Sequence, residues 1–206
     1  MDPQFRRSQS ALRAAIYELA ATRAPTDISV TELCKAAGVT RETFYRHSSS
    51  PLELLANTLA AEIDLLPKAW EKAVVVEDPE DLFPAMARKV LSHVASHADV
   101  YRAALQPSLL SPLRTNLEQM MRPGLIAYLE AHPEVIPEAV DPSDHFGLGL
   151  LASYTASGCV GAIEWWIQGA DLDLDRGVRL LIAATPTFWM SKTNLMRPQG
   201  DRAIES

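Results

Sequence analysis

The sequence contains very little cysteine. Only Cys34 and Cys159 occur in 206 residues, and no C-x-x-C pair is present. This excludes a disulfide framework and a zinc site built on paired cysteines. The N-terminal segment also lacks the apolar run and small-residue cleavage site of a signal peptide. We therefore expect a protein of the reducing cytoplasm.

Long uncharged runs are also scarce. Residues 146–163 form one uncharged stretch of 18 residues, close to the length that spans a bilayer. The stretch contains serine, threonine and tyrosine together with four glycines. We therefore expect a buried helix that packs closely on a neighbouring helix, and no membrane partner.

The motifs of common enzyme classes are missing. There is no G-x-S-x-G elbow, no P-loop and no dinucleotide-binding fingerprint, so we expect neither an enzyme nor a cofactor. His93 and His97 have the spacing of metal ligands, but they lack an H-E-x-x-H motif and a third ligand would have to come from elsewhere. We therefore expect no metal site. The acidic run over residues 171–175 lacks the glycine and glutamate of a calcium loop.

Negative charge is in excess, but it is unevenly distributed. The net charge is −7, whereas residues 1–50 hold seven basic and five acidic side chains, a balance of +2. A mildly basic head on an acidic body is typical of a protein in which only the head meets phosphate.

Apolar residues recur at helical spacing along the whole chain. No alternating run is long enough for a sheet, so we predict an all-α fold of about nine helices. Longer helices are predicted over 112–131, 143–169 and 174–193, the second capped by Asp141-Pro142-Ser143. The predicted organisation is a helix-turn-helix head over 1–49, a larger helical domain over 50–196 and a polar tail over 197–206.

The most informative segment is residues 28–55. Ser29 and Ser50 each begin an S-x-x-E capping box, which predicts a helix start. Gly38 allows the positive φ of a tight turn between two short helices, and Thr40 is a suitable N-cap for the second. The small core between these helices is expected to contain Leu33, Ala36, Val39 and Phe44. This pattern predicts a helix-turn-helix whose second helix enters the DNA major groove.

These residues resemble the TetR family of bacterial one-component transcriptional regulators. The matching segments are Ala37-Gly38-Val39-Thr40, Thr43-Phe44-Tyr45-Arg46-His47, and Ser50 with Glu53-Leu54-Leu55. The resemblance covers about residues 9–57 and implies a DNA-binding head followed by a ligand-binding and dimerisation domain. Ser48 stands where the family usually has phenylalanine, and Pro51 where it usually has lysine. We therefore expect fewer phosphate contacts and a flatter salt dependence.

The resemblance implies that Tyr45 and His47 contact phosphate and position the second helix. Thr31, near a helix N-terminus, can add a hydroxyl contact to phosphate. Arg41 and Thr43 are the candidates for base edges, through guanine O6 and N7 and through a thymine methyl group. The full predicted DNA-binding set is Thr31, Lys35, Thr40, Arg41, Thr43, Tyr45, Arg46 and His47.

The resemblance also implies a homodimer and a small-molecule effector. Apolar stripes on the last two long helices predict a four-helix interface between subunits, formed by Leu151, Tyr154, Gly158, Ala162, Trp165, Leu181, Phe188 and Trp189. Aromatic, methionine and histidine side chains between residues 60 and 170 suit an apolar or planar ligand. The candidates are Trp70, His93, His97, Tyr101, Met120, Met121, Tyr128, Phe146 and Trp166.

We therefore expect a dimeric repressor that a small apolar or aromatic effector releases from a palindromic operator in double-stranded DNA. One alternative stays open: a helical ligand-binding or adaptor protein whose DNA-binding head has lost activity. Ser48 and Pro51 favour this alternative, whereas the intact Thr40, Tyr45 and His47 favour the regulator.

Overall fold

The secondary-structure elements of the described residues are helices. The computed structural model describes residues 3–63, 79–105 and 110–189. Within these ranges lie nine α-helices and three short 3-10 helices, which confirms the all-α prediction. The α-helices are α1 (Pro3–Ala20), α2 (Val30–Ala37), α3 (Arg41–Tyr45), α4 (Pro51–Ile63), α6 (Pro79–Ser96), α7 (Ala98–Ala103), α8 (Ser111–Ala131), α9 (His145–Trp166) and α10 (Leu174–Ala184). The predicted tail over 197–206 lies outside the described residues.

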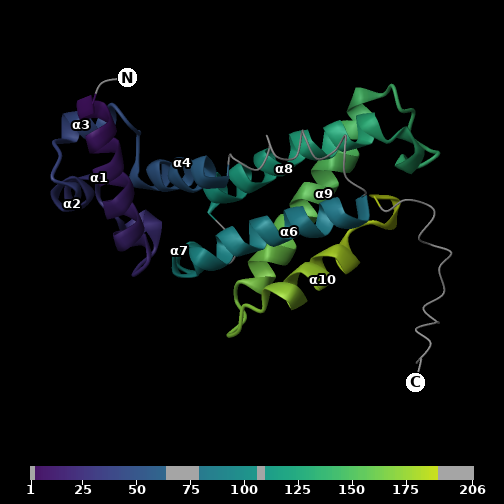
Figure 1. Ribbon diagram of the computed structural model, residues 1–206. Coiled ribbons are helices and arrows are strands. Elements are labelled where there is room, and N and C mark those ends of the chain that lie inside the picture. Colours follow the sequence, from purple (N-terminus) through teal and green to yellow (C-terminus); the bar gives the residue numbers. More distant parts are fainter. Residues whose placement is uncertain (1–2, 64–78, 106–109, 190–206) are drawn as a thin grey trace.

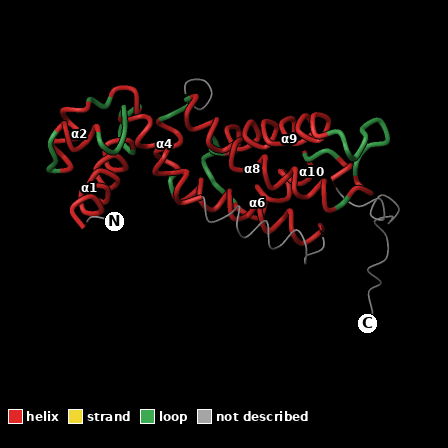
Figure 2. The backbone as a smooth tube through the Cα atoms, turned by 90° about the horizontal axis from the view of Figure 1, so that it is seen from above, coloured by secondary structure: helices red, strands yellow, loops and turns green. Residues whose placement is uncertain are grey.

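The helices form a small head and a larger body, joined by α4 (Figure 1). The head contains α1, α2 and α3, and the body contains α6 to α10. The linking helix α4 packs against α1 on one side and against α8 on the other, while α7 also contacts α1. Seen from above, head and body lie at opposite ends of an elongated molecule (Figure 2).

Local capping defines the two short helices of the head. Ser29 Oγ accepts a hydrogen bond from the Glu32 amide at 3.2 Å, so α2 begins where the capping motif predicts. Gly38 ends α2 in the left-handed conformation, with φ of +64°. Thr40 Oγ1 then accepts a hydrogen bond from the Thr43 amide at 3.1 Å and begins α3.

A continuous buried core runs from the head through α4 into the body. Leu12 of α1 and Phe44 of α3 are fully buried in the head, and Leu55 of α4 is fully buried beside them. The same cluster extends to Leu91 of α6 and Ile163 of α9. Burial of these side chains removes apolar surface from water, so α4 is held by the hydrophobic effect at both of its ends.

The last helix ends earlier than predicted. The periodicity predicts a helix to residue 193, but α10 stops before Thr185, which is extended with φ of −70° and ψ of 138°. Pro186 is the cause, because proline has no N–H for a helical bond and disfavours the helical conformation of the residue before it. Trp189 instead folds back into a second core cluster, beside Phe83 and Tyr128.

The start of α9 also differs from the prediction. Asp144 is the N-cap, and its carboxylate accepts a hydrogen bond from the Phe146 amide at 3.0 Å. Asp141 instead accepts hydrogen bonds from the amide and hydroxyl of Ser143 in the preceding turn. Within the described ranges, α9 is the one helix long and apolar enough to cross a membrane, a test that core helices of soluble proteins also pass.

Close packing of α10 makes Gly177 intolerant of a side chain. A Cβ atom there would lie 2.8 Å from Trp166 Nε1 and 3.1 Å from Leu91 Cδ1. We expect Gly177→Ala to lower the free energy of unfolding by about 1–3 kcal/mol, because the packed indole must move. The control is Gly149→Ala in α9, where a Cβ meets nothing within 4 Å. It should be neutral or stabilising by up to about 1 kcal/mol. Urea unfolding measures both, and equal stability of the two variants would contradict this packing.

Candidate functional site

The helix α3 buries one side chain in the core of the head and exposes others to solvent. Phe44 is fully buried in the core of the head. Tyr45 is 58% exposed although it is aromatic, and its ring packs edge-on against Phe44 with centroids 5.3 Å apart. The other predicted DNA contacts that are exposed are Thr31, Lys35, Thr40, Arg41 and Arg46. The helix α3 is thus anchored by Phe44 and presents Arg41 and Tyr45 to solvent.

The hydroxyl groups of Thr40 and Thr43 meet at the start of α3. Thr40 Oγ1 caps the helix and lies 3.0 Å from Thr43 Oγ1. A threonine hydroxyl can both donate and accept, so these contacts leave hydrogen-bonding capacity for a further partner. Both residues remain in the predicted DNA-binding set.

His47 ties the end of α3 to α1. Its Nε2 atom lies 2.8 Å from Ser8 Oγ, and its ring lies 4.1 Å from the ring of Phe5, measured between centroids. Burial and the nearby charge of Arg46 lower the pKa of His47, so the ring is neutral at pH 7. His47 therefore fixes the angle between α1 and α3, a role that the sequence pattern did not predict.

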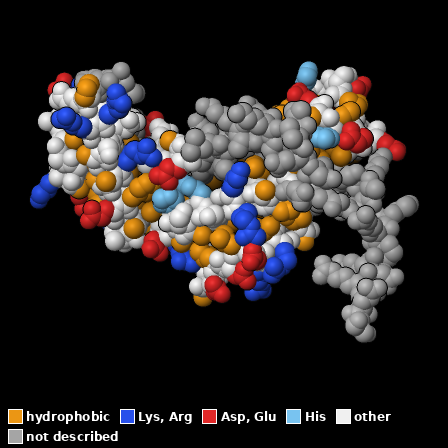
Figure 3. All heavy atoms as spheres, viewed as in Figure 1, with side chains coloured by type: hydrophobic (Ala, Val, Ile, Leu, Met, Phe, Trp, Pro, Cys, Tyr) orange, Lys and Arg blue, Asp and Glu red, His pale blue; other side chains and the backbone are white. Residues whose placement is uncertain are grey.

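A groove of about 400 Å³ lies between α1 and the α2–α3 turn. Arg7 from α1 and Arg46 from the end of α3 both line it, together with Thr40, Thr43 and His47. Several basic side chains are visible over the head (Figure 3). This concentration of positive charge beside exposed hydroxyl groups suits an anionic partner such as a phosphate backbone.

In the body, α9 carries an exposed apolar band. Its members are 59% to 80% exposed and follow one another at helical spacing: Phe146, Leu150, Tyr154 and Trp165. We call these four residues the apolar band. Beside it, a groove of about 380 Å³ separates α9 from α10 and is lined by Tyr154, Gly158, Ala162 and Leu181, all four predicted for the dimer interface. The sequence did not predict Leu150, because α9 is apolar on both faces and its periodicity does not distinguish them.

Three other predicted interface residues pack within the subunit. Trp189 is fully buried, and its Nε1 donates a hydrogen bond to Thr155 Oγ1 at 2.8 Å, so its predicted place on the interface is wrong. Leu151 and Phe188 pack against the same second core cluster. The early end of α10 explains Phe188 and Trp189, because neither continues the stripe on that helix.

An apolar cavity of about 70 Å³ lies between α6, α8, α9 and α10. It is smaller than typical ligand pockets of about 300–1,000 Å³. Its lining is Phe83, Met86, Ala87, Val90, Met121, Leu125, Thr155, Cys159, Leu181, Ile182 and Thr185. Of these residues only Met121 was predicted as a ligand contact, because cavity-lining and core residues share the same helical spacing.

The residues predicted to contact a ligand are dispersed. Phe146 is 80% exposed on the apolar band, so its predicted place in an interior pocket is wrong. Tyr128 is fully buried in the second core cluster, and Trp166 packs against the main one. Met120 also packs, partly buried, against the main core. Trp70 lies outside the described residues.

The remaining three predicted ligand residues lie together at the junction of head and body. His93 and His97 contact Glu62, which the sequence did not single out, and Tyr101 contacts His93. Glu62 and His97 are 35 positions apart in the chain and 2.7 Å apart at their nearest side-chain atoms. No local pattern connects residues at such a separation, so only the fold brings them together.

No family model and no curated protein sequence matches the chain. Solved structures do match over most of its length. FadR from Thermus thermophilus, a TetR-family repressor in complex with lauroyl-CoA, is 19% identical, with a TM-score of 0.59 over 96% of this chain and 100% of that one. NalD from Pseudomonas aeruginosa, the secondary repressor of the MexAB-OprM multidrug efflux pump, is 15% identical, with a TM-score of 0.60 over 89% and 98%. RolR in complex with resorcinol is 15% identical, with a TM-score of 0.59 over 97% and 98%.

The chain has the TetR-family fold. Within this TetR-family fold, the two departures from the family sequence pattern are accommodated locally. Ser48 is buried, and its hydroxyl donates to the Ser50 carbonyl at 3.0 Å. Pro51 is the first residue of α4, where no N–H is needed. The Glu53 amide donates to Ser50 Oγ at 3.1 Å, as the predicted capping box requires.

Tyr45 and Phe44 are adjacent but should differ in their contribution to stability. We expect Tyr45→Ala to change the free energy of unfolding by no more than about 0.5 kcal/mol, because the side chain is largely exposed. Phe44→Ala should lower it by about 3–5 kcal/mol, because it empties a buried site. Urea unfolding of both variants tests this division. A large loss in Tyr45→Ala would mean that Tyr45 is a core residue of the head.

Proposed function

We propose that this protein is a ligand-responsive, DNA-binding transcriptional repressor that acts as a homodimer. The single observation that carries the proposal is α3: a capped five-residue helix that buries Phe44 and exposes Arg41, Tyr45 and Arg46 in a TetR-family fold. Exposed guanidinium and hydroxyl groups of this kind suit contact with the phosphates and base edges of a duplex. We assign the DNA-binding domain to residues 1–49 and the ligand-binding and dimerisation domain to residues 50–196.

In the proposed DNA complex, α3 enters the major groove. Arg41 at its N-terminus reads a base edge through two hydrogen bonds, and Thr43 contacts a neighbouring base. Tyr45 and His47 bind phosphate and fix the register, with Thr31 and Lys35 of α2 supporting the backbone contact. Arg46 adds general attraction to the duplex.

The proposed dimer uses the apolar band and the adjacent groove between α9 and α10. Four large side chains that are 59% to 80% exposed on one helix are costly to leave in water. A second copy would cover them by a two-fold contact, in which the projecting aromatic rings of one subunit meet the groove of its partner. Such a dimer sets the spacing of two recognition helices, which must be about 34–36 Å to meet successive major grooves.

The proposed effector is a small apolar or aromatic molecule that binds in the body. The cavity between α6, α8, α9 and α10 supports this role, because Met86 and Met121 line it and flexible methionine side chains allow it to enlarge. The effector would favour the conformation in which the recognition helices are wrongly spaced, and so release the operator.

We further propose a cytoplasmic protein without catalytic activity.

Selection of bound sequences from a random duplex library tests DNA binding. We expect the full-length protein to enrich a palindromic sequence. Arg41→Ala should weaken binding to that sequence by about 1–3 kcal/mol and relax the preference at one position of each half-site. The control is Arg179→Ala on α10, which removes the same charge far from α3 and should bind like the wild type.

Two outcomes are informative in that selection. Loss of binding in Tyr45→Ala, with wild-type stability, supports a direct phosphate contact. If no sequence is enriched at low salt, with or without candidate effectors, the regulator is excluded. The alternative of a helical ligand-binding or adaptor protein, which Ser48 and Pro51 favour, then takes its place.

Sedimentation equilibrium tests the dimer. Trp165→Arg places a charge on the apolar band and should weaken self-association by at least about 30-fold, as expected when a large aromatic residue is lost from an interface. Glu138→Gln is the matched control, because it raises the net charge equally at an exposed loop position. Unchanged association in Trp165→Arg would exclude the apolar band as the interface.

A further inference from the structure

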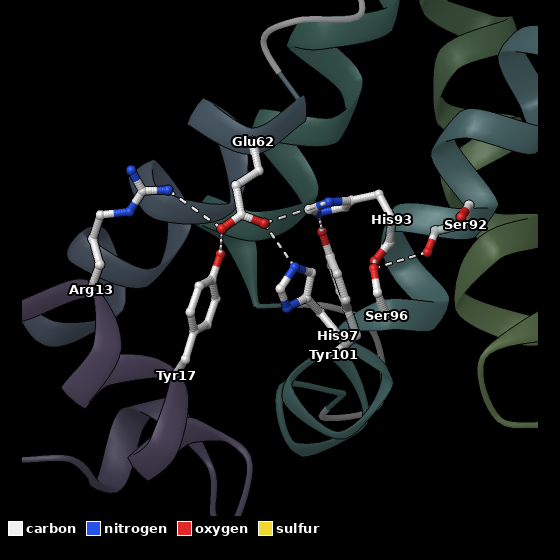
Figure 4. Close-up of polar contacts among 8 residues, drawn as sticks. All are labelled: Arg13, Tyr17, Glu62, Ser92, His93, Ser96, His97 and Tyr101. Carbon is white, nitrogen blue, oxygen red and sulfur yellow. Dashed lines mark hydrogen bonds and ion pairs between the residues drawn. The ribbon is translucent and has the colours of Figure 1, made fainter. Parts of the chain in front are cut away.

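Glu62 lies near the end of α4, at the point where the head meets the body (Figure 4). On the head side, the Tyr17 hydroxyl donates to Glu62 Oε1 at 2.8 Å, and Arg13 Nη2 lies 3.4 Å from the same oxygen. Both residues belong to α1. One oxygen of the carboxylate is therefore held entirely by the head.

The other oxygen of Glu62 faces two histidines of the body. His97 Nε2 lies 2.7 Å from Glu62 Oε2, and His93 Nδ1 lies 3.9 Å from it. The second nitrogen of His93 faces the Tyr101 hydroxyl at 3.3 Å, and the His97 ring stacks on Tyr17. The Tyr101 hydroxyl thus orients His93, as in metal sites where an outer partner fixes the ligating nitrogen, while stacking orients the ring of His97.

The pKa values of Glu62 and His93 are both shifted from their ordinary values. Burial and the neighbouring His97 lower the pKa of His93 to about 4, so its ring is neutral at pH 7. Burial alone would raise the pKa of Glu62, but hydrogen bonds from Tyr17 and His97 outweigh it and lower the pKa. Glu62 is thus in the ionised form, and His93 in the neutral form, in which these groups bind a metal ion.

We propose that Glu62, His93 and His97 bind one divalent transition-metal ion of the zinc type. One ligand atom from each residue lies within 4.8 Å of the others. Tetrahedral zinc with bonds of about 2.0–2.1 Å places its ligand atoms about 3.3 Å apart. The 2.7 Å and 3.9 Å separations in the cluster bracket that value, so small side-chain shifts suffice. Two imidazoles and a carboxylate leave the fourth position for water.

The donor set also selects the class of ion. Imidazole nitrogen suits zinc and its first-row neighbours, whereas magnesium and calcium prefer oxygen ligands alone. A bound ion would join α4 to α6 and to the residue that precedes α7. Through Glu62 Oε1 it would also orient Tyr17 and Arg13, and so connect the head to the body.

Competition with a chromophoric zinc indicator tests the site in the full-length, untagged protein after removal of metal with a chelator. We expect one zinc ion per chain, unaffected by excess magnesium or calcium. Glu62→Gln and His97→Ala should each weaken zinc binding by at least about 100-fold, beyond the range of about 10–100-fold that is typical of outer-shell changes. Tyr17→Phe, an outer-shell change, should weaken it about 10-fold. The control is His145→Ala, whose side chain is 88% exposed far from the cluster, and it should bind like the wild type.

Cobalt binding to the wild-type protein gives a second measurement that needs no variant. Visible absorption of four-coordinate cobalt that disappears on addition of one equivalent of zinc supports the site. Absence of stoichiometric zinc binding in the wild type, or unchanged affinity in both Glu62→Gln and His97→Ala, would overturn the proposal. The measurement does not involve DNA, so its outcome is independent of the proposed repressor function.

Discussion

Burial of the apolar face of α4 is the constraint on which the rest of the molecule depends. Leu54 and Leu55 lie in the main core together with head residues, and Leu59 lies further along α4 in the same cluster. The helix contacts α1 at one side and α8 at the other, so its position is determined by two groups of helices at once. The short helices α2 and α3 could not be stable alone, because isolated helices of fewer than about 12–15 residues are marginal in water.

The polar contacts of Glu62 lie at the junction of head and body, beyond the buried Leu59 of α4. Glu62 follows Leu59 by less than one turn and accepts contacts from α1 and from the end of α6. A charged group at such a place is costly to bury, and its partners offset that cost. The orientation of the head therefore depends on a small number of directional contacts in addition to nonspecific burial. This is where a ligand of either kind, an effector in the body or an ion at Glu62, could change the angle between head and body.

Sequence reasoning was most successful where structure is determined locally. The caps at Ser29, Gly38 and Thr40 depend on residues no more than a few positions apart, and the structure has them as predicted. The prediction was wrong at the end of α10. The apolar periodicity continues past Pro186, whereas a helical backbone cannot continue through that proline. The cavity and the Glu62 cluster could be predicted only in part: Met121 was a candidate ligand contact, and His93 and His97 have the spacing of metal ligands. The other residues come from distant helices, and nothing in their spacing distinguishes them from ordinary core.

In α3, Phe44 is buried whereas Arg41 and Tyr45 are exposed, and this arrangement affects how the protein can evolve. Stability of the head depends on Phe44, on Gly38 and on the caps, whereas the proposed recognition depends on Arg41 and Tyr45. Substitution at the exposed positions can therefore change which DNA is preferred without loss of the folded state. Proteins that share only 15% to 19% of their residues with this chain keep the same fold, as such a separation allows. Within one scaffold, binding preference can diverge freely while the architecture stays constant.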